Sequence, residues 1–272
     1  MPLTSNRIVQ AFRELRRDGK RTVLPFLTAG YPSLETTEAL LRRFDELGVR
    51  VCELGVPFTD PIADGPIIQA SYTEALAAGV TSRKVFEMVR RYRAAGGGMA
   101  LLAMVSYSIV FRHGVEGFVK QAADAGLDGL IVPDLPLDES GEMERLADQA
   151  GLALVLLIAP TTPPDRRLEI ARHSRGFIYY VSVSGITGER AGLPAQTIAA
   201  VGEFRKHTDT PVCVGFGVSN PATVAQVCAV ADGAIVGSAI VRRIAEHKAD
   251  PPDALAATVG DFVAALLGPL AG

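Results

Sequence analysis

Residues 50–66 read Arg-Val-Cys-Glu-Leu-Gly-Val-Pro-Phe-Thr-Asp-Pro-Ile-Ala-Asp-Gly-Pro. An apolar run with one glutamate passes directly into prolines and glycines, which predicts a buried strand that leaves its sheet into a rigid loop. A solvated loop would explain Asp60, but Glu53 lies inside the apolar run, where an ionisable group is costly unless it is used or paired. The sequence therefore predicts functional carboxylates at the end of a strand, with Glu53 and Asp64 as the candidates.

Similar apolar runs recur along the chain and alternate with segments of helical periodicity. The runs lack clean polar alternation, as expected for parallel strands that are covered on both faces. Eight strands are predicted, over Val23–Leu27, Val51–Leu54, Met99–Val105, Gly129–Val132, Ala153–Ile158, Phe177–Val181, Val212–Gly215 and Gly233–Val236. About eight strand–helix repeats in a chain of 272 residues predict an α/β fold, a closed (β/α)8 TIM barrel rather than an open sheet.

Helices are predicted between the strands, where apolar residues recur at helical spacing. They cover Leu34–Leu47, Gly114–Ala125, Ser140–Ala150, Pro164–His173, Ala195–Lys206 and Pro221–Ala231, with Ser33, Asp138 and Ser219 as expected caps. Two helices are additions to the repeat: an extra N-terminal helix at Asn6–Arg17 and an extra helix after strand 2, at Ser82–Ala95. No linker or shift in composition divides the chain, so residues 1–272 are expected to form a single TIM-barrel domain.

Composition limits the classes of partner. A net charge of −3 gives no reason to expect a nucleic acid or an anionic membrane. No uncharged apolar stretch reaches about eighteen residues, and the N-terminus lacks a signal-peptide pattern, so no membrane partner is expected. Cys52, Cys213 and Cys228 form no motif and suit a reducing compartment, which favours a cytoplasmic location.

A phosphate site is predicted at the carboxyl ends of the last three strands, since active sites of TIM barrels lie at that face. Glycines occur in the loop Ser184–Gly192, in Gly215–Gly217 and at Gly237. They let backbone amides approach an anion, and Ser238 begins a short helix, Ala239–His247, whose N-terminus favours negative charge. Basic residues are absent from Gly215–Gly217 and Gly237–Ser238, and the loop Ser184–Gly192 has one, Arg190, so backbone amides are expected to hold the phosphate.

Several other chemistries lack the residues that they need. All five lysines fall in helices or connections, so a Schiff-base aldolase has no evident nucleophile. The four histidines lie far apart without ligand-like spacing, so no metal site is expected. A carboxylate pair that faces a phosphate therefore predicts metal-free, cofactor-free acid–base catalysis on a small organic phosphate.

Residues 53–66 resemble the signature of the tryptophan synthase alpha chain family, Glu-Leu-Gly-x-Pro-(Phe/Tyr)-(Ser/Thr)-Asp-Pro-x-Ala-Asp-Gly-Pro. The resemblance extends nearly end to end, through Pro25–Pro32, Pro133–Pro136, Ser184–Gly188, Gly215–Ser219 and Gly237–Ile240. It implies a carbon–carbon lyase of tryptophan biosynthesis that cleaves indole-3-glycerol phosphate to indole and D-glyceraldehyde 3-phosphate in a retro-aldol step.

The resemblance also implies roles for individual residues. Glu53 would move protons between C3 of the indole and the glycerol hydroxyl, and Asp64 would stabilise positive charge at the indole N–H. The loop Gly185–Leu193 would be a mobile lid. The residues expected to bind substrate are Phe26 and Tyr179 around the indole, Thr187 paired with Asp64, and Gly188, Gly217, Gly237 and Ser238 around the phosphate.

A partner is implied as well, because alpha chains of this family work in an αββα heterotetramer with a beta chain. The pyridoxal phosphate is expected in that beta chain, and no cofactor is expected in this chain. Asp60 in the turn Pro57–Pro61 matches the loop that communicates with the partner. Ser106, Ser108 and Ile109 depart from the family pattern Met-Thr-Tyr-Tyr-Asn-Pro-(Ile/Val)-Phe at the same rim, so weaker activation by the beta chain is expected.

Three alternatives stay open at the level of sequence. A stand-alone indole-3-glycerol phosphate lyase would release free indole without a partner. Another phosphate-binding barrel, such as an isomerase or epimerase, is disfavoured because lysine and histidine are missing from the strand ends. A non-catalytic barrel that only activates a partner is disfavoured because both acids are present.

Overall fold

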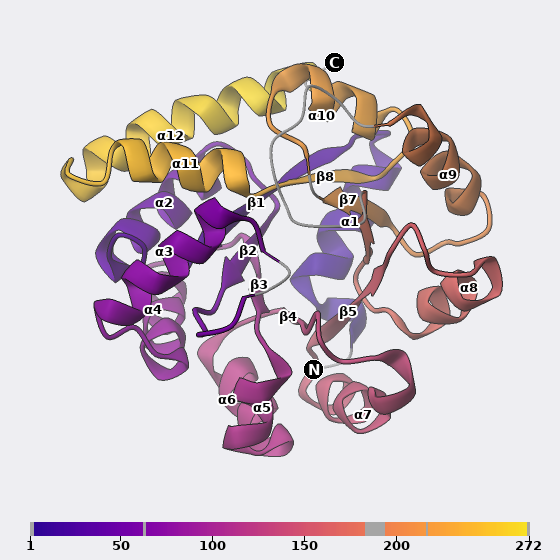
Figure 1. The fold of residues 1–272 in the computed structure, drawn as a ribbon, viewed down its shortest axis with the longest axis horizontal. Coiled ribbons are helices and arrows are strands. Elements are labelled where there is room, and N and C mark those ends of the chain that lie inside the picture. The colour runs from indigo at the N-terminus through magenta and orange to yellow at the C-terminus, as the bar shows by residue number, and fades with distance from the viewer. Residues whose placement is uncertain (1–2, 62–63, 183–193, 216, 271–272) are drawn as a thin grey trace.

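The computed structural model describes residues 3–61, 64–182, 194–215 and 217–270. Within these residues, eight parallel strands close into a barrel in chain order, and helices surround it (Figure 1). The strands are β1 Thr22–Thr28, β2 Val51–Gly55, β3 Ala100–Met104, β4 Gly129–Ile131, β5 Ala153–Ile158, β6 Ile178–Val181, β7 Val212–Gly215 and β8 Gly233–Val236. The expected TIM barrel is confirmed.

The helices include both expected additions, α1 before β1 and α4 after β2. The α-helices are α1 Arg7–Arg17, α2 Leu34–Glu46, α3 Pro66–Ala77, α4 Ser82–Ala94, α5 Tyr107–His113, α6 Val115–Ala125, α7 Gly141–Ala150, α8 Pro164–His173, α9 Ala195–Arg205, α10 Pro221–Cys228, α11 Ser238–Glu246 and α12 Pro252–Leu267; short 3-10 turns are η1 Leu3–Ser5, η2 Leu137–Glu139 and η3 Gly268–Leu270. Helices α3, α5 and α12 were not predicted from the sequence. The seven residues of α5 are too few to show a period.

One of the three expected helix caps is confirmed. The side chain of Ser33 accepts a hydrogen bond from the Thr36 N–H at the start of α2. The other two caps are wrong: Asp138 lies in η2, and α10 is capped by Asn220 rather than Ser219. Pro221 occupies the first turn of α10, which makes the preceding residue the cap.

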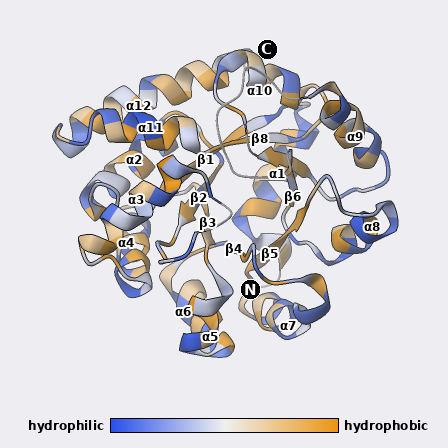
Figure 2. Cartoon of the chain, viewed as in Figure 1, coloured by the Kyte–Doolittle hydropathy of each residue, from blue (hydrophilic) through white to orange (hydrophobic). Residues whose placement is uncertain are grey.

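Apolar side chains form two layers, one inside the barrel and one between the strands and the helices. Along β2, Val51 belongs to the inner layer, whereas Cys52 and Leu54 belong to the outer one. Because side chains alternate along a strand, Glu53 faces the interior of the barrel. Figure 2 shows helices with both hydrophobic and hydrophilic residues around this apolar centre.

Two buried aspartates fasten the amino ends of the strands. Asp128, just before β4, accepts hydrogen bonds from Arg93 at 2.7 Å and Arg7 at 3.0 Å, and from the Leu101 N–H at 2.9 Å. Asp232, just before β8, accepts two bonds from Arg205, at 2.8 and 3.0 Å, and one from the N–H of the first residue of β7, at 3.0 Å. We call these groups the Asp128 clamp and the Asp232 clamp.

Helix α1 covers the same end of the barrel. Asn6 caps it, accepting from the Ile8 N–H at 3.0 Å, and the Asn6 amide donates to the carbonyls of Asp128 and Gly151 at 2.7 and 2.8 Å. Ile8 and Phe12 extend into the inner apolar layer. This end is therefore filled and fixed, which leaves the opposite end for chemistry.

Helix α12 bears on the expectation that no membrane is involved. Together with η3 it forms a segment, Pro252–Leu270, that is long and apolar enough by length and composition to cross a membrane. Leu255, Val259, Val263 and Leu266 recur on one side and are buried. Such a stripe is also typical of a helix that packs on a barrel, and one such helix is weak evidence for a membrane. The lack of a membrane partner stays a prediction.

Candidate active site at the carboxyl ends of the strands

Glu53 has a carboxyl group that is buried and unpaired. Its side chain is 0% exposed, and its neighbours in register are Phe26 on β1 and Leu102 on β3. Neither carboxyl oxygen has a hydrogen-bond partner in the described part of the chain. Burial raises the pKa of Glu53 well above its ordinary value, because the charged form loses its water. The protonated form of Glu53 is thus favoured, and among the described residues its carboxyl group is not tied up in a structural hydrogen bond.

Asp64 stands at the end of the acidic loop, directly before the N-cap Gly65 of α3. The N-cap itself is a glycine, which has no side chain to cap the helix. Burial raises the pKa of Asp64 to about 6. A helix N-terminus by itself would lower the pKa of a nearby acid, so loss of water is the larger effect here. Asp64 is consequently a carboxyl group that titrates near neutral pH.

Two buried tyrosines lie within the electrostatic reach of both acids. Burial raises the pKa of Tyr179 on β6, and negative charge at Glu53 and then Asp64 raises it further. Burial also raises the pKa of Tyr72 on α3, followed by the charges of Asp64 and Glu53. Both phenols therefore remain protonated donors beside the carboxyl groups. Tyr72 was missed from the sequence because α3 was not predicted.

Aromatic rings occupy the space beside two strand-end glycines. A Cβ built on Gly55 would lie 2.5 Å from Cζ of Phe26 and 2.5 Å from the Tyr72 hydroxyl. A Cβ on Gly215 would overlap the ring of Tyr179 in the same way. These glycines admit the aromatic side chains, so their presence does not itself indicate phosphate binding.

The described part of the expected phosphate site shows open backbone. Gly217 has φ +80°, and a Cβ there would meet no atom within 4 Å. Gly237 is the N-cap of α11 and Ser238 its first residue, with no side-chain hydrogen bond at that cap. A Cβ on Gly237 would be 3.6 Å from Phe26, so this helix start adjoins the aromatic wall. Thr187, Gly188 and the lid Gly185–Leu193 lie outside the described residues.

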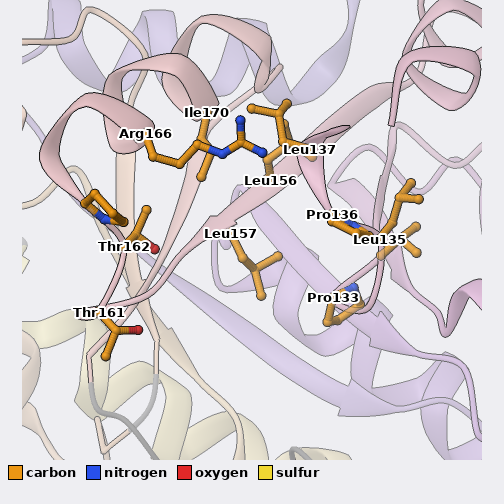
Figure 3. Close-up of a pocket in the computed structure, with 12 residues that line it drawn as sticks. Pro133, Leu135, Pro136, Leu137, Leu156, Leu157, Thr161, Thr162, Arg166 and Ile170 are labelled. Carbon is orange, nitrogen blue, oxygen red and sulfur yellow. The ribbon is translucent and has the colours of Figure 1, made fainter. Parts of the chain in front are cut away.

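A cavity of about 340 Å³ lies beside the barrel mouth, between the segments that follow β4 and β5 (Figure 3). Its walls are mostly apolar, with Arg166 at one side held by Asp138 at 2.5 Å and Glu169 at 2.8 Å. Neither Glu53 nor Asp64 lines it. The cavity is separate from the carboxyl pair. In the described residues no group of three or more His, Cys, Asp or Glu side chains could hold a metal ion.

The rim that departs from the family pattern is internally bonded. Ser106 caps α5 and donates a hydrogen bond to Asp134 at 2.8 Å, and the Tyr107 N–H donates to the other oxygen of Asp134 at 2.8 Å. The hydroxyls of Ser106 and Ser108 are 2.8 Å apart. Phe111 on α5 is 72% exposed. The substitutions thus form a local network between the β3 and β4 ends.

The family model of the tryptophan synthase alpha chain matches residues 12–263. The chain belongs to the tryptophan synthase alpha chain family. The alpha chain of Rhodopirellula baltica is 45% identical over 260 residues, which are 92% of this chain and 94% of that protein. The alpha chain of Geobacter sulfurreducens is 44% identical over 261 residues, 96% of this chain and 97% of that one.

Solved structures agree in fold. Tryptophan synthase subunit alpha of Legionella pneumophila superposes with a TM-score of 0.85 at 30% identity, covering 97% of this chain and 98% of that one. A structure of Mycobacterium tuberculosis tryptophan synthase superposes with a TM-score of 0.85 at 34% identity, covering 96% of this chain and 98% of that one. Membership of the family makes the chain a carbon–carbon lyase that cleaves indole-3-glycerol phosphate to indole and D-glyceraldehyde 3-phosphate in tryptophan biosynthesis. The alpha chain of this family needs no cofactor.

Proposed function

We propose that Glu53 and Asp64 carry the acid–base chemistry of this lyase reaction. The observation that carries the proposal is the buried carboxyl group of Glu53 inside the barrel, which has no hydrogen-bond partner among the described residues. A carboxyl group with a raised pKa is a good proton donor near neutral pH, whereas Asp64, with a pKa of about 6, is largely ionised there. Different environments thus separate the roles of the two acids.

The reaction then needs one proton donor and one fixed negative charge. Glu53 gives its proton to C3 of the indole ring, and the positive charge that develops at the indole N–H is stabilised by Asp64. The bond between C3 and the glycerol carbon breaks, and its electron pair restores the aromatic ring. The hydroxyl proton of that carbon returns to Glu53 as the aldehyde forms, so the acid ends in its starting state.

The substrate is oriented by the surrounding residues. The rings of Phe26 and Tyr179 are buried at the mouth and suit the flat, apolar indole. Gly217, Gly237 and Ser238 offer backbone amides and open space for the phosphate, at the start of a nine-residue helix. Gly188 and Thr187 belong to the same proposal on the strength of the sequence.

Substitution of each acid tests the proposal in the isolated chain. Glu53→Gln removes the transferable proton and should reduce indole release by at least ~10²-fold, with substrate affinity largely kept. Asp64→Asn should also reduce turnover while the fold is kept. Asp60→Asn is the matched control, since Asp60 is an exposed acid of the same loop. Near-native indole release by Glu53→Gln would contradict the role of Glu53.

The partner of this lyase is proposed to be a beta chain that carries pyridoxal phosphate, in an αββα heterotetramer. Asp60 and the Ser106–Ile109 segment would lie at the contact. Because the Ser106 hydroxyl is already bonded to Asp134, it is less free for a partner, which supports weaker activation than is typical of the family. A single domain, a cytoplasmic location and the absence of a membrane or nucleic-acid partner belong to the same proposal.

A titration with a cognate beta chain tests the partnership. The rate of indole release should rise on addition of the beta chain, but modestly. No change at a saturating concentration would favour a stand-alone lyase. Activation by several orders of magnitude would show that the substitutions at Ser106, Ser108 and Ile109 do not weaken coupling.

A further inference from the structure

Gln69, on α3, bonds back to the loop that carries Asp64. Its side-chain amide donates to the carbonyl oxygen of Asp64 at 2.7 Å and to that of Pro61 at 3.2 Å. The Asp64 N–H donates to the same Pro61 carbonyl at 3.0 Å. Both amide hydrogens of one side chain are thus used on carbonyls at the two ends of the segment that leads to Asp64. We call this arrangement the Gln69 clasp.

The helix that bears the clasp is itself tied to the barrel. The hydroxyls of Ser71 on α3 and Thr28 at the end of β1 are 2.7 Å apart and buried. The ring of Tyr72 on α3 packs against Phe58 of the acidic loop, with 5.6 Å between the centroids. The contact with β1 therefore fixes the position of Gln69 on α3. Through the hydrogen bonds of the clasp, Gln69 in turn fixes the backbone at Asp64.

Asp64 needs such a restraint. Burial takes water away from its carboxyl group and raises its pKa to about 6, and a free loop would relieve that cost by turning the group toward solvent. Among the described residues, Tyr72 on α3 and Tyr179 on β6 interact electrostatically with Asp64, as they do with Glu53 on β2, and neither tyrosine is a cation that would hold Asp64 by charge. Hydrogen bonds from Gln69 to the carbonyls of Asp64 and Pro61 are one means of holding it in place.

We propose that Gln69 is a positioning residue for Asp64: its side-chain amide clasps the loop so that the Asp64 carboxylate keeps its partly buried position. The inference rests on the proposed role of Asp64 and adds to it a residue that acts through the loop. Gln69 makes no contact with the reacting atoms in this proposal. If Gln69 served only to stabilise the start of α3, its substitution would change the stability of the chain but not the titration of Asp64.

The variant Gln69→Met tests the proposal, since it keeps the length of the side chain and removes both donors. Indole release by the isolated chain should fall by about 10–100-fold in kcat/KM, because small displacements of a catalytic group are costly. The acid limb of the pH profile should move from near pH 6 to lower pH, because a carboxylate that regains water has a lower pKa. KM should change less than kcat.

Thr73→Ala is the matched control. Thr73 is exposed one turn further along α3, and its hydroxyl donates to the Gln69 carbonyl at 3.0 Å, so the variant perturbs the helix but not the clasp. Rate and pH profile should both stay as in the parent chain. If Gln69→Met does not fold, Gln69→Asn serves instead, because it is shorter by one methylene and cannot reach both carbonyls.

The outcomes separate this proposal from the one on which it rests. If the acid limb of the pH profile is the same in Gln69→Met as in the parent chain, the positioning role is wrong, whether or not the rate or the melting temperature of the variant falls. If Asp64→Asn retains native indole release, the proposed role of Asp64 itself is wrong. If Asp64→Asn is impaired while Gln69→Met is native in rate and pH profile, only the clasp proposal fails.

Discussion

The hydroxyl of Tyr72 takes the place of a side chain at Gly55: a Cβ on this glycine would lie 2.5 Å from the phenol oxygen. Gly55 ends the strand that carries Glu53, and Tyr72 belongs to the helix that follows Asp64. The glycine therefore lets α3 pack against the end of β2. This contact brings the elements that bear the two acids together.

Gly55→Ala should disturb this packing. The added methyl group would press on Phe26 and Tyr72, and overpacking of this kind costs about 1–3 kcal/mol of unfolding free energy. Urea unfolding measures the cost. The double variant Gly55→Ala/Tyr72→Phe should recover part of the loss, because it removes the Tyr72 hydroxyl, one of the three atoms that clash with the added methyl group. If the changes in unfolding free energy caused by Gly55→Ala and by Tyr72→Phe simply add in the double variant, the contact between the two residues is not the cause of the loss.

Glu53→Gln should raise thermal stability in a pH-dependent way. The folded-state pKa of Glu53 is raised, so the unfolded chain releases this proton first and wild-type stability falls as the pH rises above about 4.3. Glutamine lacks that penalty. The melting temperature of the variant should therefore exceed that of the parent at pH 8, and the two should converge near pH 4. A constant difference at every pH would contradict the buried-acid explanation.

Gly217→Ala should weaken binding of the phosphorylated substrate. The new methyl group would enter the open space proposed for the phosphate, so KM should rise. Gly48→Ala is the matched control: it has φ +77° against +80° at Gly217, also has no atom within 4 Å, and lies in the turn after α2. Both variants should lose about 1–2 kcal/mol of stability from the left-handed backbone, but only Gly217→Ala should change KM. An equal KM for the two would remove Gly217 from the phosphate site.

Asp128→Ala should destabilise the chain strongly and leave catalysis intact. It leaves Arg93, whose side chain is 12% exposed, without its carboxylate, and breaking a buried ion pair costs about 3–5 kcal/mol. Asp124→Ala, which breaks an exposed pair with Lys120, should cost less than about 1 kcal/mol. Chemical denaturation compares the two, and kcat at a temperature where both are folded should match the parent. A lowered kcat would mean that the clamp reaches the active site.

The barrel could be predicted because its signals are local, whereas the reaction came from the resemblance of residues 53–66 to a known family. Apolar runs gave the strands, and Glu53 stood out because a carboxyl group within such a run has no structural explanation. The clasp could not be foreseen, since Gln69 is an ordinary helix residue until α3 is known to turn back on its own loop. Tyr72 was missed for the same reason. The caps of α7 and α10 were assigned to the wrong residues, Asp138 and Ser219, because several polar residues precede each helix and the sequence does not show which one has the backbone conformation of a cap.

The clamps at Asp128 and Asp232 have a consequence for how the molecule tolerates change. They precede β4 and β8, which lie four strands apart in a closed ring of eight, and each joins an arginine of an earlier helix to the N–H of a neighbouring strand. The ring is thus fastened twice, once in each half, with no residue shared between the fastenings. Loss of one clamp should therefore leave the hydrogen bonds of the other clamp in place.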